Sequence, residues 1–458
     1  MPHLLISAAH KSSGKTTLSI GLCAALKQRG LIVQPFKKGP DYIDPLWLSE
    51  AAGNPCYNLD FYTMSKEEII KLMVCRSQHS DISLIEANKG LYDGLDLDGS
   101  NSNAALAKLV NAPVILVLST KGMTRGIAPL ILGYQQFDKD IHIAGVILNQ
   151  VGGSRHESKL RAIIEHYTDI SVIGAVQFNP QLNIDERHLG LMPSNEIKAV
   201  QLKINTIANI VSNSVNLDQL LTLANFSAPT VTTCSKKTNK KTHLRLGILR
   251  DQAFGFYYPE DLENLQHLGA ELVFINALHD QQLPNLDGLF IGGGFPEMYA
   301  EQLSSNMGLK KAIYNAIENN LPVYAECGGL MYLAKHLIIR EKAFEMVGAL
   351  DLDTQMFERP QGRGYVHLQE TGNGLWKLEN SNEKSATFAA HEFHYSKAIN
   401  ISPNLQFAYQ VLRGMGVDGK HDGIVYKNTL ASYSHLRTVE NNAWTNRFIN
   451  FIENTKQK

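Results

Sequence analysis

Cys327 is the side chain with the clearest potential for chemistry, and it lies in the string YAECGG at residues 324–329. A cysteine followed by two glycines, between an expected strand and an expected helix, is typical of a tight elbow. At such a turn the neighbouring N–H groups and the start of the helix favour a thiolate and can hold an oxyanion. The alternative is an inert buried cysteine, which is the commoner fate of this residue type.

Two further segments favour the reactive interpretation of Cys327. The string GGGFPE at residues 292–297 follows another expected strand, and the amides of this loop and of the residue after Cys327 are candidates for an oxyanion hole. Far downstream, His435 lies in ASYSHLR at residues 431–437. A lone histidine is usually structural, but in this order the three features predict a thiol nucleophile with a histidine as general base and acid.

A second kind of chemistry is indicated near the N-terminus by AHKSSGKTT at residues 9–17. An apolar run precedes this string and a helix-like run follows it, with Ala9 at the place of the usual first glycine. Backbone N–H groups of such a loop cradle phosphate oxygens, Lys15 supplies a positive charge, and the Thr16 hydroxyl can ligate magnesium. We therefore predict a nucleotide site, against the alternative of a plain glycine turn before a helix.

Acidic residues follow two other expected strands. GPDYIDP occupies residues 39–45, and Glu86 precedes GLYDG at residues 90–94. Ligands of open α/β sheets lie at the carboxyl ends of the strands, and carboxylate and phosphate oxygens suit magnesium. The alternative is that Asp44 and Asp93 are ordinary turn residues among Gly and Pro.

The elements that must position these residues alternate between strand and helix. Apolar runs of strand length occupy residues 4–8, 32–36, 82–86, 114–118 and 144–148, then 244–249, 272–275, 288–291 and 322–325. This rhythm predicts mostly parallel sheets covered by helices. The polar, basic stretch 227–243 is expected to be a linker, and 343–436 is expected to be richer in β-structure.

Composition bounds the class of protein. The chain has 458 residues, of which 44% are hydrophobic and 19% charged, and 43 Lys+Arg against 44 Asp+Glu leave a net charge of −1. The length favours two domains, and the balanced charge gives no reason to expect nucleic acid or an anionic membrane as partner. The apolar runs are too short to cross a bilayer, so we expect a cytoplasmic protein. The five cysteines indicate neither a disulfide framework nor a zinc knuckle.

Seven strings together resemble the cobyrinic acid a,c-diamide synthase family. They are the phosphate loop, residues 39–45 and 90–94, RHLGL at 187–191, DQAFGFYY at 251–258, the loop at 292–297 and the Cys327 elbow. The similarity runs over nearly the whole chain. It implies an N-terminal P-loop, dethiobiotin-synthetase-like parallel-sheet domain (1–226), a linker (227–243) and a C-terminal class I glutamine amidotransferase α/β domain (244–458).

The resemblance also implies roles for particular residues. The nucleotide contacts are Gly14, Lys15, Thr16, Thr17 and Asn149; the magnesium ligands are Thr16, Asp41 and Glu86; the acceptor-binding residues are Tyr42, Ile43, Asp44 and Asp93. Cys327 is the glutaminase nucleophile, His435 is its partner, and Gly293, Gly294 and Gly328 hold the oxyanion. Relatives in the wider class place a glutamate two residues after the histidine. Arg437 stands there in this chain, which leaves the third member of the triad unassigned.

The implied reaction uses ATP and Mg²⁺ to convert a carboxylate into an acyl phosphate, which ammonia from glutamine then attacks. In the family the acceptors are the a and c acetates of cobyrinic or hydrogenobyrinic acid. The expected partners are therefore small molecules, glutamine and a corrin precursor, and a homodimer is left open.

Two rivals are also left open. The first is amidation of another tetrapyrrole, such as nickel sirohydrochlorin, or of another carboxylate. The second is a nucleotide-switched P-loop binding protein, although that class carries a lysine where this chain has His10 and would leave the Cys327 half without a role.

Overall fold

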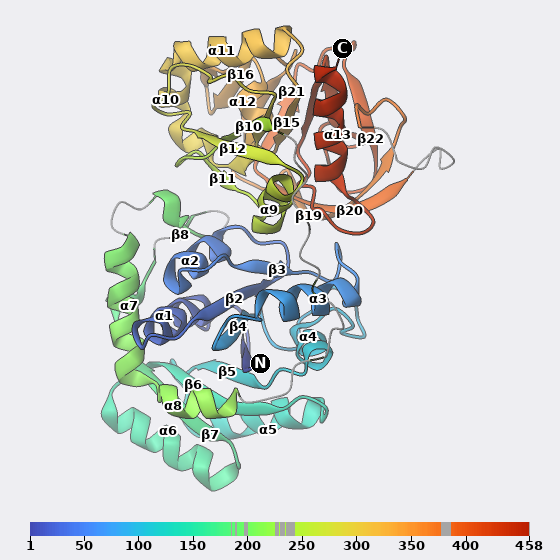
Figure 1. Ribbon diagram of the computed structural model, residues 1–458. Helices are drawn as coiled ribbons and strands as arrows, with labels where there is room; N and C mark the ends of the chain where they lie inside the picture. Colours follow the sequence, from blue (N-terminus) through green and yellow to red (C-terminus); the bar gives the residue numbers. More distant parts are fainter. Residues whose placement is uncertain are drawn as a thin grey trace. The chain divides into compact units, whose positions relative to one another are not determined.

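The computed structural model describes residues 1–184, 186–187, 190–196, 200–224, 229, 234, 243–376 and 386–457. The chain divides into two compact units, Met1–Ser235 and Lys236–Lys458, which are coloured from blue to green and from green to red in Figure 1. Most of the expected linker at 227–243 lies outside the described residues. Its proposed boundaries at 226 and 244 therefore stay predictions.

The first unit is built on a sheet with the strand order β3-β2-β4-β1-β5-β6-β7, and every pairing described in it is parallel. Its strands are β1 (His3–Ala8), β2 (Val33–Lys38), β3 (Tyr57–Leu59), β4 (Ile82–Glu86), β5 (Val114–Ser119), β6 (Ile143–Val151) and β7 (Ser171–Gln177). The expected strands are confirmed within a few residues, whereas β3 and β7 were not expected. The carboxyl ends of β1, β2 and β4 lie side by side, which is where a ligand site forms in such sheets.

Helices surround this sheet (Figure 1). They are α1 (Lys15–Gln28), α2 (Ile43–Ala52), α3 (Lys66–Arg76), α4 (Asn103–Val110), α5 (Ile127–Phe137), α6 (Ser154–Tyr167), α7 (Val200–Ser214) and α8 (Leu217–Leu223), with the short elements η1 (Pro180–Leu182), β8 (Glu186–Arg187), β9 (Gly190–Leu191) and η2 (Ser194–Glu196). Helix α1 packs on α2 and α7. A methyl group at Gly21 would lie 2.5 Å from Val211 Cγ2, so this glycine permits the close approach of α1 to α7.

The second unit has a mixed sheet with the order β12-β10-β13-β15-β24-β23-β22-β19-β20. These strands are β10 (Leu244–Leu249), β12 (Ala270–Ile275), β13 (Gly288–Ile291), β15 (Val323–Glu326), β19 (Gly362–Glu370), β20 (Thr387–His394), β22 (Gln406–Arg413), β23 (His421–Tyr426) and β24 (Thr429–Ser432). The pairings from β12 to β24 are parallel and those from β24 to β20 are antiparallel. The expected β-rich character of residues 343–436 is confirmed.

The remaining elements of this unit are a smaller sheet, a short strand pair and the helices. A smaller sheet contains β16 (His336–Ile339), β17 (Lys342–Glu345), β18 (Asp353–Met356) and β21 (Ser396–Ile399), and β11 (Phe254–Phe256) pairs with β14 (Gly293–Gly294). The helices are α9 (Pro259–His267), η3 (Pro296–Tyr299), α10 (Ala300–Ser305), α11 (Met307–Glu318), α12 (Gly328–Leu333) and α13 (Trp444–Lys456). One core packs α11 and α12 on the sheet, and another packs α13 on it around Trp444 and Phe448.

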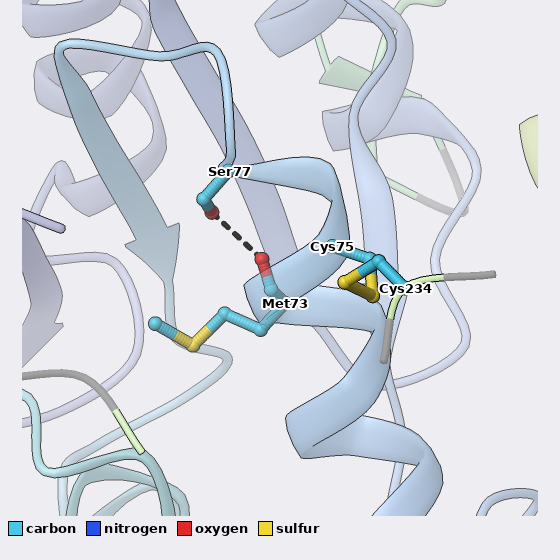
Figure 2. The surroundings of a disulfide bond; sticks show 4 residues. All are labelled: Met73, Cys75, Ser77 and Cys234. Carbon is cyan, nitrogen blue, oxygen red and sulfur yellow. Dashed lines mark hydrogen bonds between the residues drawn. A yellow bond between two sulfur atoms is a disulfide. The ribbon is translucent and has the colours of Figure 1, made fainter. Parts of the chain in front are cut away.

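The cysteines differ from expectation. Cys75, near the end of α3, forms a disulfide with Cys234 across a sequence separation of 159 residues, as Figure 2 shows. The free thiols are those of Cys23, Cys56 and Cys327, all buried. The sequence prediction was wrong here because partners this distant in sequence leave no local spacing pattern to recognise.

No helix in the described part of the chain combines the length and the apolar character that a membrane span requires.

We predict that the disulfide can be read directly by chemical labelling. When the protein is unfolded in an alkylating reagent without a reductant, Cys23, Cys56 and Cys327 should be labelled while Cys75 and Cys234 stay protected. Cys75→Ser should lower the free energy of unfolding by about 2–4 kcal/mol, because the cross-link restricts the unfolded chain. Cys56→Ser is the control that keeps the bond. Labelling of Cys75 in the unreduced protein would contradict the assignment.

Candidate active site

The phosphate loop runs from β1 into α1. Gly14 has φ 83° at the N-cap of α1, a conformation that glycine adopts without steric cost. A Cβ at this position would collide with the side chain of Asn149, whose Nδ2 donates a hydrogen bond of 2.9 Å to the Ser13 carbonyl. The structure thus brings together Gly14, Lys15 and Asn149, three of the residues expected at the nucleotide. Thr16 and Thr17 lie in the first turn of α1.

A buried ammonium group lies between the carboxylates of the neighbouring strand ends. Lys37 Nζ is 2.5 Å from Asp44 Oδ2, 3.1 Å from Glu86 Oε1 and 4.0 Å from Asp41 Oδ2. Burial lowers the pKa of Lys37, but Asp44, Glu86 and Asp41 together raise it above its ordinary value. Burial also lowers the pKa of Lys15, and Lys37 adds to that effect. Lys37 was missed from the sequence, although a lysine two residues before Gly39 was visible there.

The carboxylates respond in opposite directions to this environment. Burial has the largest single effect on Asp44 and raises its pKa, but Lys37, Lys15 and the Thr16 hydroxyl together lower the pKa below its ordinary value. For Glu86, burial prevails and the pKa is raised. The difference follows the geometry, because Asp44 lies closer to Lys37 than Glu86 does.

Two of the expected magnesium ligands, Thr16 and Glu86, are in direct contact. The Thr16 hydroxyl donates a hydrogen bond of 2.6 Å to Glu86 Oε1 and lies 3.4 Å from Asp44 Oδ2. The other oxygen of Glu86, Oε2, is buried and makes no hydrogen bond among the described residues. That orphaned anionic oxygen fits a hard cation. In the described residues, however, no three His, Cys, Asp or Glu side chains form a ready metal-binding group, so phosphate oxygens would have to complete the coordination.

The loop after β4 contacts the phosphate loop. The Gly90 N–H donates to Asp93 Oδ2 at 2.9 Å, and a methyl group at Gly90 would lie 2.7 Å from the Ala9 carbonyl oxygen. Asp93 is therefore held beside the start of the phosphate loop. A cavity of about 520 Å³ adjoins this loop, and Tyr92, Leu97 and Phe137 are among the residues that line it.

The other acceptor-side residues lie at the start of α2. Asp41 Oδ1 accepts hydrogen bonds of 2.9 and 3.1 Å from the N–H groups of Ile43 and Asp44, and Tyr42 is the N-cap residue. The structure places Tyr42, Ile43 and Asp44 in the same unit as Asp93. Of the RHLGL motif, residues 188 and 189 lie outside the described residues.

In the second unit Cys327 forms the predicted elbow between β15 and α12. Its backbone has φ 48° and ψ −101°, which is strained for a residue with a Cβ. Its N–H donates a hydrogen bond of 2.7 Å to the Ser432 carbonyl on β24. The sheet therefore holds the nucleophile in a backbone conformation that the residue would not adopt alone.

The glycine loop is positioned by the DQAFGFYY string. Within it, Phe254–Phe256 pairs antiparallel with Gly293–Gly294, and Tyr257 OH accepts a hydrogen bond of 2.9 Å from the Gly292 N–H. A methyl group at Gly328 would lie 3.1 Å from the Gly294 nitrogen. The loop thus lies against the elbow, and the three expected oxyanion glycines are brought together.

His435 lies against the same loop. A methyl group at Gly293 would be 2.6 Å from Cε1 of its ring. His435 Nδ1 is 3.2 Å from Glu326 Oε2. Arg437 forms an ion pair with Glu260 and its guanidinium lies over the Tyr258 ring, so it does not face His435 in place of an acid.

The electrostatics of Cys327 differ from the sequence expectation of a stabilised thiolate. Burial raises the pKa of this thiol far above its ordinary value, and Glu297 raises it further, whereas a hydrogen bond from the Gly328 amide lowers it only in part. The resting nucleophile is therefore a thiol, and it needs a base to become reactive. His435 is the base that the sequence predicts for this role.

Comparisons with known proteins agree with this division of the chain. Residues 245–443 match the family described as CobB/CobQ-like glutamine amidotransferase domain, and residues 3–185 match the AAA domain family.

Several relatives that match nearly the whole chain share one name. "Cobyrinate a,c-diamide synthase" of Magnetococcus marinus is 45% identical over 95% of this chain and 94% of the relative. The protein of that name from Archaeoglobus fulgidus is 39% identical over 98% of this chain and 97% of the relative. The one from Listeria monocytogenes is 36% identical over 99% of this chain and 100% of the relative. On this identity and coverage, together with the P-loop unit and the Cys327 elbow unit, the chain belongs to the cobyrinate a,c-diamide synthase family.

Proposed function

We propose that the protein catalyses ATP- and glutamine-dependent amidation of the a and c acetate carboxylates of cobyrinic acid or its cobalt-free counterpart. The observation that carries the proposal is the strained Cys327 elbow, packed against a glycine loop and a histidine, in a chain that also carries a phosphate loop. Family membership supports the choice of acceptor. A switch protein of the P-loop class would have no use for the elbow.

In the first half-reaction a carboxylate oxygen of the acceptor attacks the γ-phosphorus of ATP, and ADP leaves. Lys15, Lys37 and the loop amides would counter the charge on the transferred phosphoryl group. Thr16, Asp41 and Glu86 would hold Mg²⁺, which when bound neutralises phosphate charge. Tyr42, Ile43, Asp44 and Asp93 would face the acceptor.

In the second half-reaction glutamine supplies ammonia. His435 would take the thiol proton of Cys327 as the sulfur attacks the side-chain amide of glutamine. The amides of Gly293, Gly294 and Gly328 would hold the oxyanion. Ammonia leaves, water releases glutamate from the thioester, and the ammonia displaces phosphate from the acyl phosphate.

The direct test is a mass-spectrometric assay with ATP, Mg²⁺ and glutamine over a panel of cobyrinic acid, hydrogenobyrinic acid and nickel sirohydrochlorin. We expect two successive acid-to-amide mass changes on a corrin acceptor. If only nickel sirohydrochlorin is amidated, the proposed acceptor is wrong and the rival tetrapyrrole is the substrate. If no acceptor is amidated, the proposed function is refuted. The cytoplasmic location and the homodimer remain predictions.

If the two units carry separate half-reactions, variants of the two sites should respond differently to ammonium. Cys327→Ser should lower glutamine-dependent amidation at least a hundredfold, since a serine hydroxyl lacks the reactivity of the thiol. Ammonium salt should restore its activity, and more strongly as the pH rises, because NH₃ is the nucleophile.

The matched variant is Lys15→Ala, which should lose amidation with either nitrogen source because the acyl phosphate no longer forms. Both proteins should keep the wild-type circular dichroism spectrum. Failure of ammonium to rescue a folded Cys327→Ser would contradict the assignment of the two chemistries to separate sites.

The raised pKa of Cys327 predicts how its alkylation depends on pH. Only the thiolate reacts with iodoacetamide, and raising the pKa of the thiol moves its ionisation to higher pH. The rate of labelling, followed by peptide mass spectrometry without glutamine, should therefore keep rising from pH 7 to pH 9.5. A free thiol compound, whose rate levels off above its pKa of about 8.5, is the control. A plateau below pH 8 would show a preformed thiolate.

A further inference from the structure

Glu326, the residue immediately before the nucleophile, makes contacts that the glutaminase chemistry described above does not use. Its side chain and that of His435 are each 3% exposed, and Glu326 Oε2 lies 3.2 Å from His435 Nδ1. Its other oxygen, Oε1, accepts a hydrogen bond of 2.8 Å from the Leu436 N–H and another from the Tyr324 hydroxyl. Three donors therefore converge on one buried carboxylate.

The sheet register brings this carboxylate to the histidine. Glu326 is the last residue of β15 and pairs with Ser432, the last residue of β24, so the chain after β24 reaches His435 three residues later. The same register places the Cys327 N–H on the Ser432 carbonyl. Acid, nucleophile and histidine are thus fixed relative to one another by a single pair of parallel strands.

The neighbouring acids are engaged elsewhere. Glu260 pairs with Arg437, Asp261 accepts hydrogen bonds from the Thr438 N–H and the Trp444 indole, and Asp422 accepts them from the backbone of residues 433 and 434. Glu326, in contrast, directs its carboxylate to the His435 ring. Arg437, at the position where the wider class carries its acid, cannot take that role.

We propose that Glu326 is the positioning residue of the glutaminase site, taking the place of the acid that the wider class carries two residues after its histidine. This inference rests on the proposed function of Cys327 and His435. An ionised carboxylate can only accept hydrogen bonds, so Glu326 fixes the tautomer of His435 that carries its proton on Nδ1. Nε2, on the same ring edge as the Cε1 that faces Gly293, then carries the lone pair that accepts the thiol proton.

The hydrogen bonds of the Glu326 carboxylate predict that Glu326→Gln changes the tautomer of His435. The fixed Leu436 N–H demands an acceptor, so the amide oxygen of Gln would take the Oε1 place and its NH₂ group would face His435 Nδ1. Nδ1 would have to accept, and the ring proton would move to Nε2, the nitrogen that should act as base. The variant keeps the size of the side chain but inverts the tautomer.

We expect Glu326→Gln to lower kcat for glutamate release by on the order of 10²–10³-fold, since wrong-tautomer histidines lose up to about 10⁴ in comparable triads. KM for glutamine should stay within about threefold, and ammonia-dependent amidation should be unchanged. Histidine-selective ¹⁵N NMR, with His435→Gln to assign the signal, should show Nδ1 protonated in the wild type and Nε2 protonated in Glu326→Gln. A merely structural carboxylate would not move that signal.

The matched control is Glu318→Gln, the same change at the last residue of α11, which pairs with Lys427 and Tyr426. It should leave every parameter unchanged. If Glu326→Gln does not fold, the variant Tyr324→Phe tests the positioning role instead. Losing one donor to the carboxylate should lower kcat several-fold at constant KM, and an unchanged kcat overturns the proposal.

The remaining outcomes also discriminate. A wild-type kcat in folded Glu326→Gln, or a change confined to KM, overturns the positioning role while leaving the proposed function intact. Absence of glutamate release in the wild type overturns both.

Discussion

The parallel pairing of β15 with β24 is the constraint on which the glutaminase unit depends. Glu326 pairs with Ser432, and the next N–H, that of Cys327, is bonded to the Ser432 carbonyl. That bond helps hold Cys327 at a positive φ of 48°, a conformation that costs of order 1–3 kcal/mol and persists only where surrounding contacts impose it. A slip of one residue in this register would turn the neighbouring side chains to the opposite face, and would separate the nucleophile from its histidine.

Strand register also organises the nucleotide unit. There the register brings buried charges together, whereas at Cys327 it holds a strained backbone. Lys37 pairs with Glu86 across β2 and β4, and the ammonium lies within 4.0 Å of three carboxylates. Removing an ion from water costs several kcal/mol unless partners compensate it. Lys37 supplies that compensation for Asp44 and Glu86, which lets carboxylates accumulate at the strand ends. The buried oxygen of Glu86 that lacks a hydrogen bond leaves a place for one further positive charge.

Local sequence patterns were sufficient for most of the strands that were expected and for the residues that lie on recognisable turns. The phosphate loop, the elbow at Cys327 and the glycine loop at residues 292–297 each combine a strand, a turn and a helix within a dozen residues, so their geometry is encoded locally. Lys37 and Glu326 were missed for the opposite reason. Each lies next to a recognised motif, but its partner comes from another strand, and only the register reveals the contact. The disulfide between Cys75 and Cys234 was also missed, because its two cysteines are far apart in the sequence.

The thiolate expectation failed because a motif describes only the groups that favour charge. Glycine amides around Cys327 do so, but its burial and Glu297 act against it, and the sequence gives no measure of either. The physical consequence suits the chemistry. A neutral thiol costs less to bury than a resting thiolate. The charges then arise together, when the proton moves to His435, whose Nδ1 already faces the Glu326 carboxylate. The site thereby separates charge only along the reaction, where an imidazolium next to a carboxylate is stabilised in a medium of low polarity.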